Sequence, residues 1–368
     1  MKLQAIFLLV FFITTPFLWW LPRHYAGRIM MLVTSAVYAW FAPLAFVLLM
    51  AGSILQWFTW RLEAVSRGRL AKWLPVLIAL LPLIVYKIGS AGYGWLIPLG
   101  LSYYAFRQIH VAFEIYKGTM VRPTLREYME YLLFLPVILI GPIHRMPEFQ
   151  RSMRRRKWDP VMISEGLERI LYGLVKICFF GNFIFSLRLK EWATTMSYWP
   201  RLYIDVITFT GNAYVQFAGF SDLAIGGGMI WGIKVMENFN APFMATNMQA
   251  FWQRWHISLS SWCRDYVFQP IAGFTRNRWA ALIASMLVLA LWHEISLRYI
   301  VWGALQALLI LLAARSRKLL PATTLLLNDH PVGKWIARIW VFHLFAFSCV
   351  LIGAGGVATI DELIKKLF

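Results

Sequence analysis

The sequence predicts an all-α, polytopic integral membrane protein, and three observations carry this prediction. The 368 residues are 60% hydrophobic and only 14% charged, whereas soluble proteins contain roughly 45–50% apolar and about 25% charged residues. The mean hydropathy is +0.61, and charge-free stretches alternate with basic clusters. This composition excludes an ordinary cytosolic domain, a disordered chain and a disulfide scaffold, because so much apolar surface needs a bilayer as its solvent.

The charge balance points to the membrane surface. The chain carries 36 Lys and Arg residues against 17 Asp and Glu residues, a formal charge of +19. In a soluble protein this excess would suggest nucleic acid, but here it indicates cytoplasmic loops that face anionic lipid. We therefore expect membrane lipids, and no nucleic acid, among the partners. Cys178, Cys263 and Cys349 lack CxxC spacing, so we predict neither disulfides nor a metal site.

The apolar segments predict the helices in order. The first run, Leu3 to Trp20, resembles a signal peptide but is long and lacks an A-x-A site, so we expect a retained span. Because a spanning helix needs about 20 apolar residues, we predict roughly ten or eleven transmembrane or re-entrant helices in one domain, 1–368. The later segments are Ile29–Trp60 (broken at Pro43), Trp73–Tyr86, Gly94–Phe106, Tyr131–Ile143, Glu165–Leu187, Tyr203–Trp231, Trp279–Trp292, Tyr299–Ala314 and Trp335–Val357. The run Gly226–Gly228 lacks the strand and GK[ST] of a phosphate loop, so it indicates close helix packing.

The segment Asn238–Gly273 is too polar to face lipid. If it is helical, one face is aromatic and the other two are polar; the aromatic face consists of Trp252, Trp255, Leu259, Trp262 and Tyr266. An amphipathic helix at the membrane interface is the simpler interpretation. The imidazole of His256 and the adjacent Arg264 and Asp265 favour a substrate cavity instead, and we expect Arg264 and Asp265 to be buried partners that support folding. The candidate substrate-binding residues here are Asn240, Trp252, Trp255, Ser260, Arg264 and Asp265.

A second polar interruption, His293 and Glu294, lies in an apolar span next to Trp292. A single histidine on an apolar helix is more often a packing residue. Two polar segments that each carry a histidine favour function, because ionisable groups at membrane depth are costly. A partly desolvated imidazole is a suitable general base near pH 7. We therefore predict His293 and His256 as catalytic residues, with Trp292 and Glu294 at the substrate site.

These motifs resemble the membrane-bound O-acyltransferase family, in particular its bacterial alginate O-acetylation and teichoic acid D-alanylation branches. The most specific string is FWQRWHISLSSWCRDYVF (251–268), and His293 and His256 match the family's two histidines. The other matching stretches are GIKVMENFNAPF (232–243), IPLGLSYYAFRQIHVAFEIYKG (97–118), YLLFLPVILIGPIHR (131–145), QFAGFSDLAIGGGMIWG (216–232) and LWHEISLRYIVWGALQA (291–307). The resemblance spans about 210 residues within a motif core of about 95–310.

The resemblance implies an O-acyltransferase with a membrane-embedded catalytic funnel. It implies an acyl thioester donor from the cytosol, either acyl-CoA, acetyl-CoA in the simplest case, or a carrier protein's phosphopantetheine, with no permanently bound cofactor. It implies an extracytoplasmic cell-envelope polysaccharide as acceptor, reached directly or through a periplasmic acyltransferase partner, and a multi-pass location in the bacterial inner membrane. D-alanyl transfer to teichoic acid-like polymers, and a non-catalytic transporter or scaffold, stay open as alternatives.

One residue departs from the family pattern. The family usually has glycine after this histidine, whereas this chain has Glu294. Glycine lets backbones approach closely, so the carboxylate occupies space that is normally empty. A carboxylate that points into the cavity can act on His293 or change the acyl group accepted, and one that points to the headgroups need do neither.

The loop charges predict the topology. The basic loops around Arg67, Arg155 and Arg317 are expected to face the cytoplasm. The loop at 23–28 is expected on the same side and the N-terminus outside, because the hairpin broken at Pro43 returns the chain. A single cysteine at position 155 should react with an impermeant maleimide only after cells are permeabilised; labelling in intact cells would contradict the topology.

Overall fold

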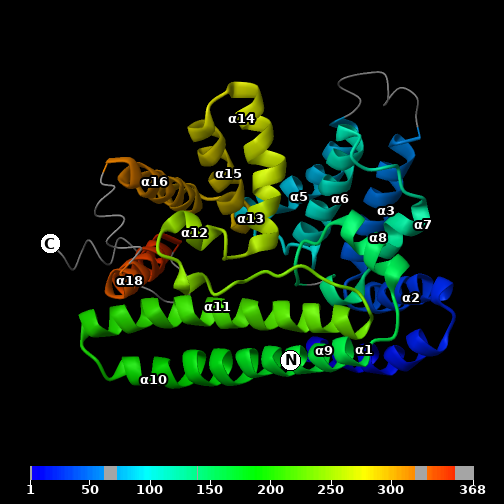
Figure 1. Cartoon of the computed structure of the whole chain (residues 1–368), viewed down its shortest axis with the longest axis horizontal. Helices are drawn as coiled ribbons and strands as arrows, with labels where there is room; N and C mark the ends of the chain where they lie inside the picture. The colour runs from blue at the N-terminus through cyan, green and yellow to red at the C-terminus, as the bar shows by residue number, and fades with distance from the viewer. Residues whose placement is uncertain (1, 62–72, 139, 320–329, 353–368) are drawn as a thin grey trace. The chain divides into compact units, whose positions relative to one another are not determined.

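The structure, a computed structural model, describes residues 2–61, 73–138, 140–319 and 330–352. These residues form helices and no strand, which confirms the predicted all-α class (Figure 1). The chain divides into two compact units: unit 1 is Met1–Leu171 with Ser221–Met236, and unit 2 is Tyr172–Phe220 with Glu237–Phe368. Two of the three boundaries fall inside the two longest helical runs and the third in the irregular segment after residue 230, and each unit is described separately.

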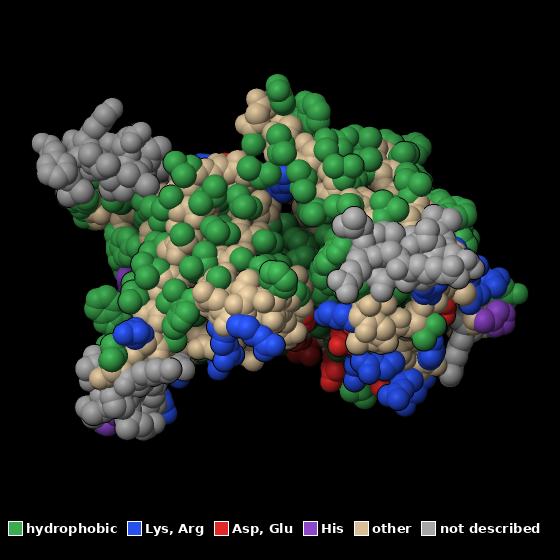
Figure 2. All heavy atoms as spheres, turned by 90° about the horizontal axis from the view of Figure 1, so that it is seen from above, with side chains coloured by type: hydrophobic (Ala, Val, Ile, Leu, Met, Phe, Trp, Pro, Cys, Tyr) green, Lys and Arg blue, Asp and Glu red, His purple; other side chains and the backbone are tan. Residues whose placement is uncertain are grey.

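Four of the described helices are long and apolar enough to cross a membrane. Three shorter apolar helices accompany them: Leu8–Trp20, Pro43–Thr59 and Arg278–His293. The long ones are Leu74–Tyr93, Pro160–Thr194, Leu297–Ser316 and Pro331–Ile352. Large apolar side chains such as Leu81, Leu312 and Trp340 point outward and are more than half exposed, and Figure 2 shows hydrophobic side chains spread over the surface. A protein that displays this much apolar surface is matched to lipid, which confirms the membrane class.

Two predicted spans are wrong. Residues 95–99 are irregular, and α6 begins only at Leu101, after Gly100 in a left-handed conformation (φ 73°). α7 ends at Leu132, and the chain then makes a short 3₁₀ turn, Leu135–Val137, with no helix over residues 140–145. Pro136 and Pro142 lack the N–H that a continuing helix would need. The part of Trp335–Val357 beyond residue 352 lies outside the described residues.

Unit 1 is a set of helices around a buried polar centre. Its helices are α1 (Lys2–Trp20), α2 (Arg23–Phe41), α3 (Pro43–Thr59), α5 (Leu74–Tyr93), α6 (Leu101–Lys117), α7 (Leu125–Leu132), α8 (Met146–Arg155) and the first part of α9 (Pro160–Leu174). Arg107 is 1% exposed and donates to the carbonyls of Tyr131 and Leu132 at 3.1 and 2.7 Å. The guanidinium thereby satisfies carbonyl groups at the C-terminus of α7 that have no partner within the helix.

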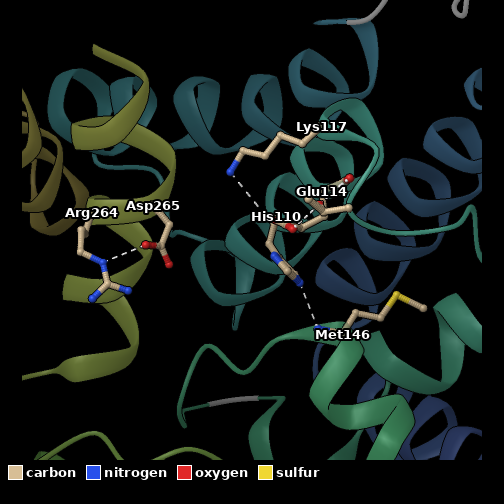
Figure 3. Close-up of polar contacts among 7 residues, drawn as sticks. His110, Glu114, Lys117, Met146, Arg264 and Asp265 are labelled. Atoms are coloured by element: carbon tan, nitrogen blue, oxygen red, sulfur yellow. Dashed lines mark hydrogen bonds and ion pairs between the residues drawn. The ribbon is translucent and has the colours of Figure 1, made fainter. Parts of the chain in front are cut away.

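Two further contacts in unit 1 close the same core. His110 on α6 accepts the backbone N–H of Met146 at 3.0 Å, where α8 begins (Figure 3). Arg156 is 3% exposed and donates to the carbonyls of Trp231 and Leu18 at 2.7 and 3.1 Å. The basic cluster at 145–157 is therefore only partly a solvated loop, because Arg156 is a buried structural residue.

Unit 2 carries both predicted catalytic histidines. Its elements are the continuous run of the π-helix η3 (Val175–Arg188) and α10 (Leu189–Thr194), most of α11 (Tyr198–Ile230), η4 (Pro242–Met244), α12 (Met248–Trp252), α13 (Ile257–Cys263), the π-helix η5 (Arg264–Phe268), α14 (Gln269–Thr275), α15 (Arg278–His293), α16 (Leu297–Leu319), α18 (Pro331–Ser348) and η6 (Cys349–Ile352). α15 and α16 form a tight hairpin: a Cβ at Gly303 would lie 2.7 Å from the Cβ of Ala290. The turn of this hairpin follows His293.

The triple glycine is a packing device, as predicted. In unit 1, a Cβ on Gly226 of α11 would lie 2.5 Å from the carbonyl oxygen of Gly166 on α9, and one on Gly228 would lie 2.6 Å from Val235. Figure 1 shows α11 running alongside α9 and α10. The absence of side chains lets the two backbones touch, as at the small-residue contacts typical of membrane helices.

This contact can be tested by adding one methyl group. We expect Gly226→Ala to lower the free energy of unfolding by about 1–3 kcal/mol, because the new Cβ meets backbone atoms that cannot rotate away. Gly92→Ala on α5 is the matched control, since a Cβ there meets nothing within 4 Å. The melting temperatures of the two detergent-solubilised variants give the comparison, and equal values would contradict the packing role.

Candidate active site

The helix predicted through residues 252–266 is broken at His256. α12 ends at Trp252 and α13 begins at Ile257, and His256 between them has φ 44° and ψ 53°, in the left-handed region. For a residue with a Cβ this conformation is strained and persists only where the surroundings hold it. The prediction of one continuous helix is therefore wrong. The side chains of Trp252, Leu259, Trp262 and Tyr266 are nevertheless buried.

Asn238 holds the break in place. Its backbone carbonyl accepts the N–H of Ile257 at 2.8 Å, and its amide oxygen accepts the Ser258 hydroxyl at 2.6 Å. Both Asn238 and Ser258 are fully buried. In addition, the backbone N–H of Asn240 donates a hydrogen bond to the carbonyl of Arg254 at 3.0 Å. The segment before η4 therefore fixes the backbone on both sides of His256.

The imidazole of His256 lies in an aromatic enclosure and is 3% exposed. Its ring meets Phe217 edge-to-face at 4.6 Å between centroids and lies 5.6 Å from Trp292. The Nε2 atom is buried and has no hydrogen-bond partner among the described residues. Burial and, secondarily, the nearby His293 lower the pKa of His256 to about 3. His256 is therefore a neutral imidazole at physiological pH, with one ring nitrogen available to a ligand.

His293 is the last residue of α15 and lies among three aromatic rings. The ring centroids of Trp292, Tyr299 and Trp302 are 4.4, 5.7 and 6.2 Å from that of His293. Tyr299 is nearly parallel to the imidazole, with an interplanar angle of 17°. Trp292 also contacts His256, so this indole touches both predicted catalytic histidines. The structure therefore brings residues 256, 292 and 293 together in unit 2.

A buried polar network supports the far side of the site. Gln306 on α16 is fully buried, donates to the Ser348 hydroxyl at 2.8 Å and accepts the indole N–H of Trp252 at 3.4 Å. The indole of Trp302 donates to the same Ser348 oxygen at 3.2 Å. These bonds connect α12, α16 and α18 and fix the orientation of Trp302 beside His293. Gln306 is not among the predicted site residues, and its signal in the sequence is a polar side chain in an apolar span.

The other predicted substrate-binding residues have separate positions. Trp255 packs against Phe251 and Phe345, with ring centroids 5.4 and 5.0 Å away. Asn240 is exposed, and the Ser260 hydroxyl bonds locally to the carbonyl of Trp255 at 3.0 Å. The structure gives these three residues roles in packing and local backbone bonding, and their contact with substrate stays a prediction.

The prediction that Arg264 and Asp265 are a buried pair is wrong. Arg264 Nε and Asp265 Oδ1 are 2.8 Å apart (Figure 3), but the Arg264 side chain is 62% exposed and that of Asp265 is 26% exposed. The two residues are neighbours at the start of the π-helix η5, where the changed helical phase turns Arg264 outward. An exposed pair of this kind contributes up to about 1 kcal/mol to stability.

Glu294 forms an ion pair with Arg298 across the turn between α15 and α16. Arg298 Nε lies 3.2 Å from Glu294 Oε1, and its Nη2 lies 2.5 Å from Oε2. The carboxylate that replaces the family's glycine is thereby charge-compensated beside the histidine site. The buried neutral imidazole of His256 and the exposed imidazole of His293, both in contact with Trp292, are suited to hydrogen bonding of a developing oxyanion and to proton transfer. No group of three His, Cys, Asp or Glu residues in the described chain could hold a metal ion.

Comparisons with known proteins show the family of this chain. The profile of the membrane-bound O-acyltransferase family, MBOAT, matches residues 101–354, and the chain belongs to this family. It is 29% identical over 310 residues to the probable alginate O-acetylase AlgI of Pseudomonas aeruginosa, covering 77% of this chain and 59% of that protein. It is 31% identical over 249 residues to the teichoic acid D-alanyltransferase of Streptococcus thermophilus, covering 61% and 60%.

A third relative is the peptidoglycan O-acetyltransferase of Helicobacter pylori, 28% identical over 260 residues, covering 58% of this chain and 46% of that protein. The chain therefore spans about half to three fifths of the length of these relatives. The similarity confirms the resemblance found in the motifs, and the names of all three relatives describe acyl transfer.

The buried neutral imidazole of His256 predicts a specific pH dependence. An unfolded histidine has a pKa of about 6.5, so between that value and about 3 the unfolded state binds more protons than the folded state. The stabilisation from burying the neutral ring is therefore complete above pH 6.5 and is lost as the pH falls toward 3. We expect wild type to lose more thermal stability between pH 7.5 and pH 5 than His256→Asn, because the variant has no imidazole to protonate. Asparagine is the chosen replacement because it tolerates the left-handed backbone.

The measurement is the difference in melting temperature between wild type and His256→Asn at each pH. His24→Asn, at an exposed position on α2, controls for general effects of acid. A difference that stays constant from pH 7.5 to pH 5 would show that His256 is not buried as a neutral group.

Proposed function

We propose that this protein transfers an acyl group, acetyl in the simplest case, from a thioester to hydroxyl groups of an extracytoplasmic cell-envelope polysaccharide. The observation that carries the proposal is that both histidine rings contact Trp292 and that one of them, His256, has a buried Nε2 atom that meets no described partner. The donor is acyl-CoA or an acylated carrier-protein phosphopantetheine from the cytosol. The acceptor is reached directly or through a periplasmic acyltransferase, from the inner membrane.

The chemistry assigns each histidine one task. The acceptor oxygen attacks the thioester carbonyl carbon, its proton passes to His293 as general base, and a C–O bond forms. The tetrahedral oxyanion then collapses, the C–S bond breaks, and the thiolate leaves with the proton that His293 took up. His256, neutral because it is buried, donates from Nε2 to the oxyanion. The aromatic rings around His256 shield its Nε2 atom from water.

Acetyl is favoured over D-alanyl by the charge near His293. A D-alanyl group carries an ammonium that is best held by a free carboxylate, and the Glu294 carboxylate is paired with Arg298. The aromatic enclosure also supplies faces for a cation, so the D-alanyl alternative keeps one supporting feature. The mass of the released acyl group distinguishes the two.

His293→Ala tests the proposal. A positioned general base contributes about 10²- to 10⁴-fold, so we expect ester-linked acyl groups on envelope polysaccharides to fall at least about 100-fold while the protein still folds. Mild alkaline release followed by mass spectrometry measures these groups in cells with wild type, with the variant and without the protein. His343→Gln on α18 is the control, because glutamine can keep the contact of this residue with Tyr203 and the side chain lies outside the site.

The outcomes separate the alternatives. Wild-type acylation in a well-folded His293→Ala protein would end the catalytic assignment. Acylation that does not depend on the protein at all would support the transporter or scaffold alternative. His256→Asn should lose less acylation than His293→Ala if it only stabilises the oxyanion, and a comparable amount if both histidines share one proton path.

A further inference from the structure

The turn between α15 and α16 contains a chain of three contacts that ends on His293. Glu294, just after the helix, has an extended backbone (φ −155°, ψ 141°) that directs its carboxylate forward along the chain. Arg298, in the first turn of α16, binds both carboxylate oxygens, at 3.2 and 2.5 Å. A two-point bond between a planar guanidinium and a carboxylate fixes orientation as well as distance.

Tyr299 links this ion pair to the imidazole. The Arg298 Cζ atom lies 5.7 Å from the centroid of the Tyr299 ring, and the same ring lies nearly parallel to His293, with centroids 5.7 Å apart. Trp302 lies next to both rings, and its ring centroid is 6.2 Å from that of His293 and 6.4 Å from that of Tyr299. Trp302 is in turn held by Ser348. The tyrosine ring is therefore enclosed by Arg298, Trp302 and His293.

We propose that Glu294 and Arg298 are positioning residues that hold Tyr299 nearly parallel to His293, with the ring centroids 5.7 Å apart, and so set the direction of the imidazole. The ion pair, the first turn of α16 and the Tyr299 ring are called the Tyr299 clamp below. Its consequence for acyl transfer rests on the proposed role of His293 as general base. The contacts themselves do not depend on that role.

The energetics favour positioning over stability as the task of the clamp. The side chains of Arg298 and Glu294 are 46% and 37% exposed, and an exposed ion pair contributes up to about 1 kcal/mol to folding. Geometry, in contrast, matters greatly next to a reacting atom, where a displacement of about 1 Å can reduce the rate about 10²-fold. A carboxylate at position 294, where the family usually has glycine, thus gains a use through Arg298.

The clamp can be observed without any enzymatic assay. In protein with isotope-labelled histidine in lipid nanodiscs, the ring-proton signal of His293 is identified by its loss in His293→Ala. Seven histidines make this spectrum tractable. Because the ring current of a neighbouring aromatic side chain changes a proton's chemical shift, Tyr299→Leu should move the His293 signal. Glu294→Gln and Arg298→Met should move it in the same direction by less, and reversal of the pair, Glu294→Arg with Arg298→Glu, should restore part of the shift.

The control is an ion pair of the same spacing in the same unit. Arg201 and Asp205 on α11 are also four residues apart, with Nε and Oδ2 at 3.7 Å. Arg201→Met should leave the His293 signal unchanged. A His293 signal that is unaffected by both Tyr299→Leu and Arg298→Met would overturn the clamp, whatever the activity of the protein.

The acylation assay supplies the catalytic part of the test. Arg298→Met should lower kcat by up to about 10²-fold with KM little changed, and Arg298→Lys should recover little because lysine cannot bind both oxygens. A shifted His293 signal with wild-type kcat would show that the clamp does not position the base. Wild-type acylation in His293→Ala would overturn the proposed function instead, and the spectral test of the clamp would stand.

Discussion

The site depends on the backbone of His256, which is held in a left-handed conformation between two short helices. Asn238 supplies the constraint, through its carbonyl to Ile257 and its amide oxygen to Ser258. In a continuous helix, the helical repeat would fix the direction of the residue 256 side chain, and the backbone N–H and C=O groups would bond within the helix. The break gives up that regularity, and the buried amide of Asn238 replaces the lost hydrogen bonds in a region without access to water.

The second part of the site comes from the α15–α16 hairpin. Gly303 lets α16 approach Ala290, so the turn brings His293 and the Tyr299 ring together at the end of two closely packed helices. The network of Gln306, Ser348 and Trp252 then joins this hairpin to α12 and α18. Side chains held by packing and by buried hydrogen bonds lose little further entropy when a substrate binds, which is the physical advantage of building such a site on helices.

Polar residues in unit 1 show the same rule in a structural setting. Arg107 and Arg156 are buried cations that bind backbone carbonyls. In each case the guanidinium satisfies carbonyl groups that a helix end or an irregular segment leaves open, so a charge that is costly to bury becomes useful. A basic residue in a membrane protein can therefore have a structural function and is not always a topology signal.

The sequence by itself determined the helical membrane class, the family, the break at Pro43, the packing role of Gly226–Gly228 and the two histidine segments, because these depend on composition and on local pattern. The structure showed that Arg264 lies outward, whereas the end of α7 before Pro136 and the pairing of Glu294 with Arg298, four residues apart, depend on local sequence. Tertiary structure also decided the left-handed turn at His256. This strained conformation is tolerated only because Asn238, eighteen positions earlier in the chain, bonds to the residues that follow His256. Helical periodicity describes one segment at a time, whereas the turn at His256 depends on a partner from another segment.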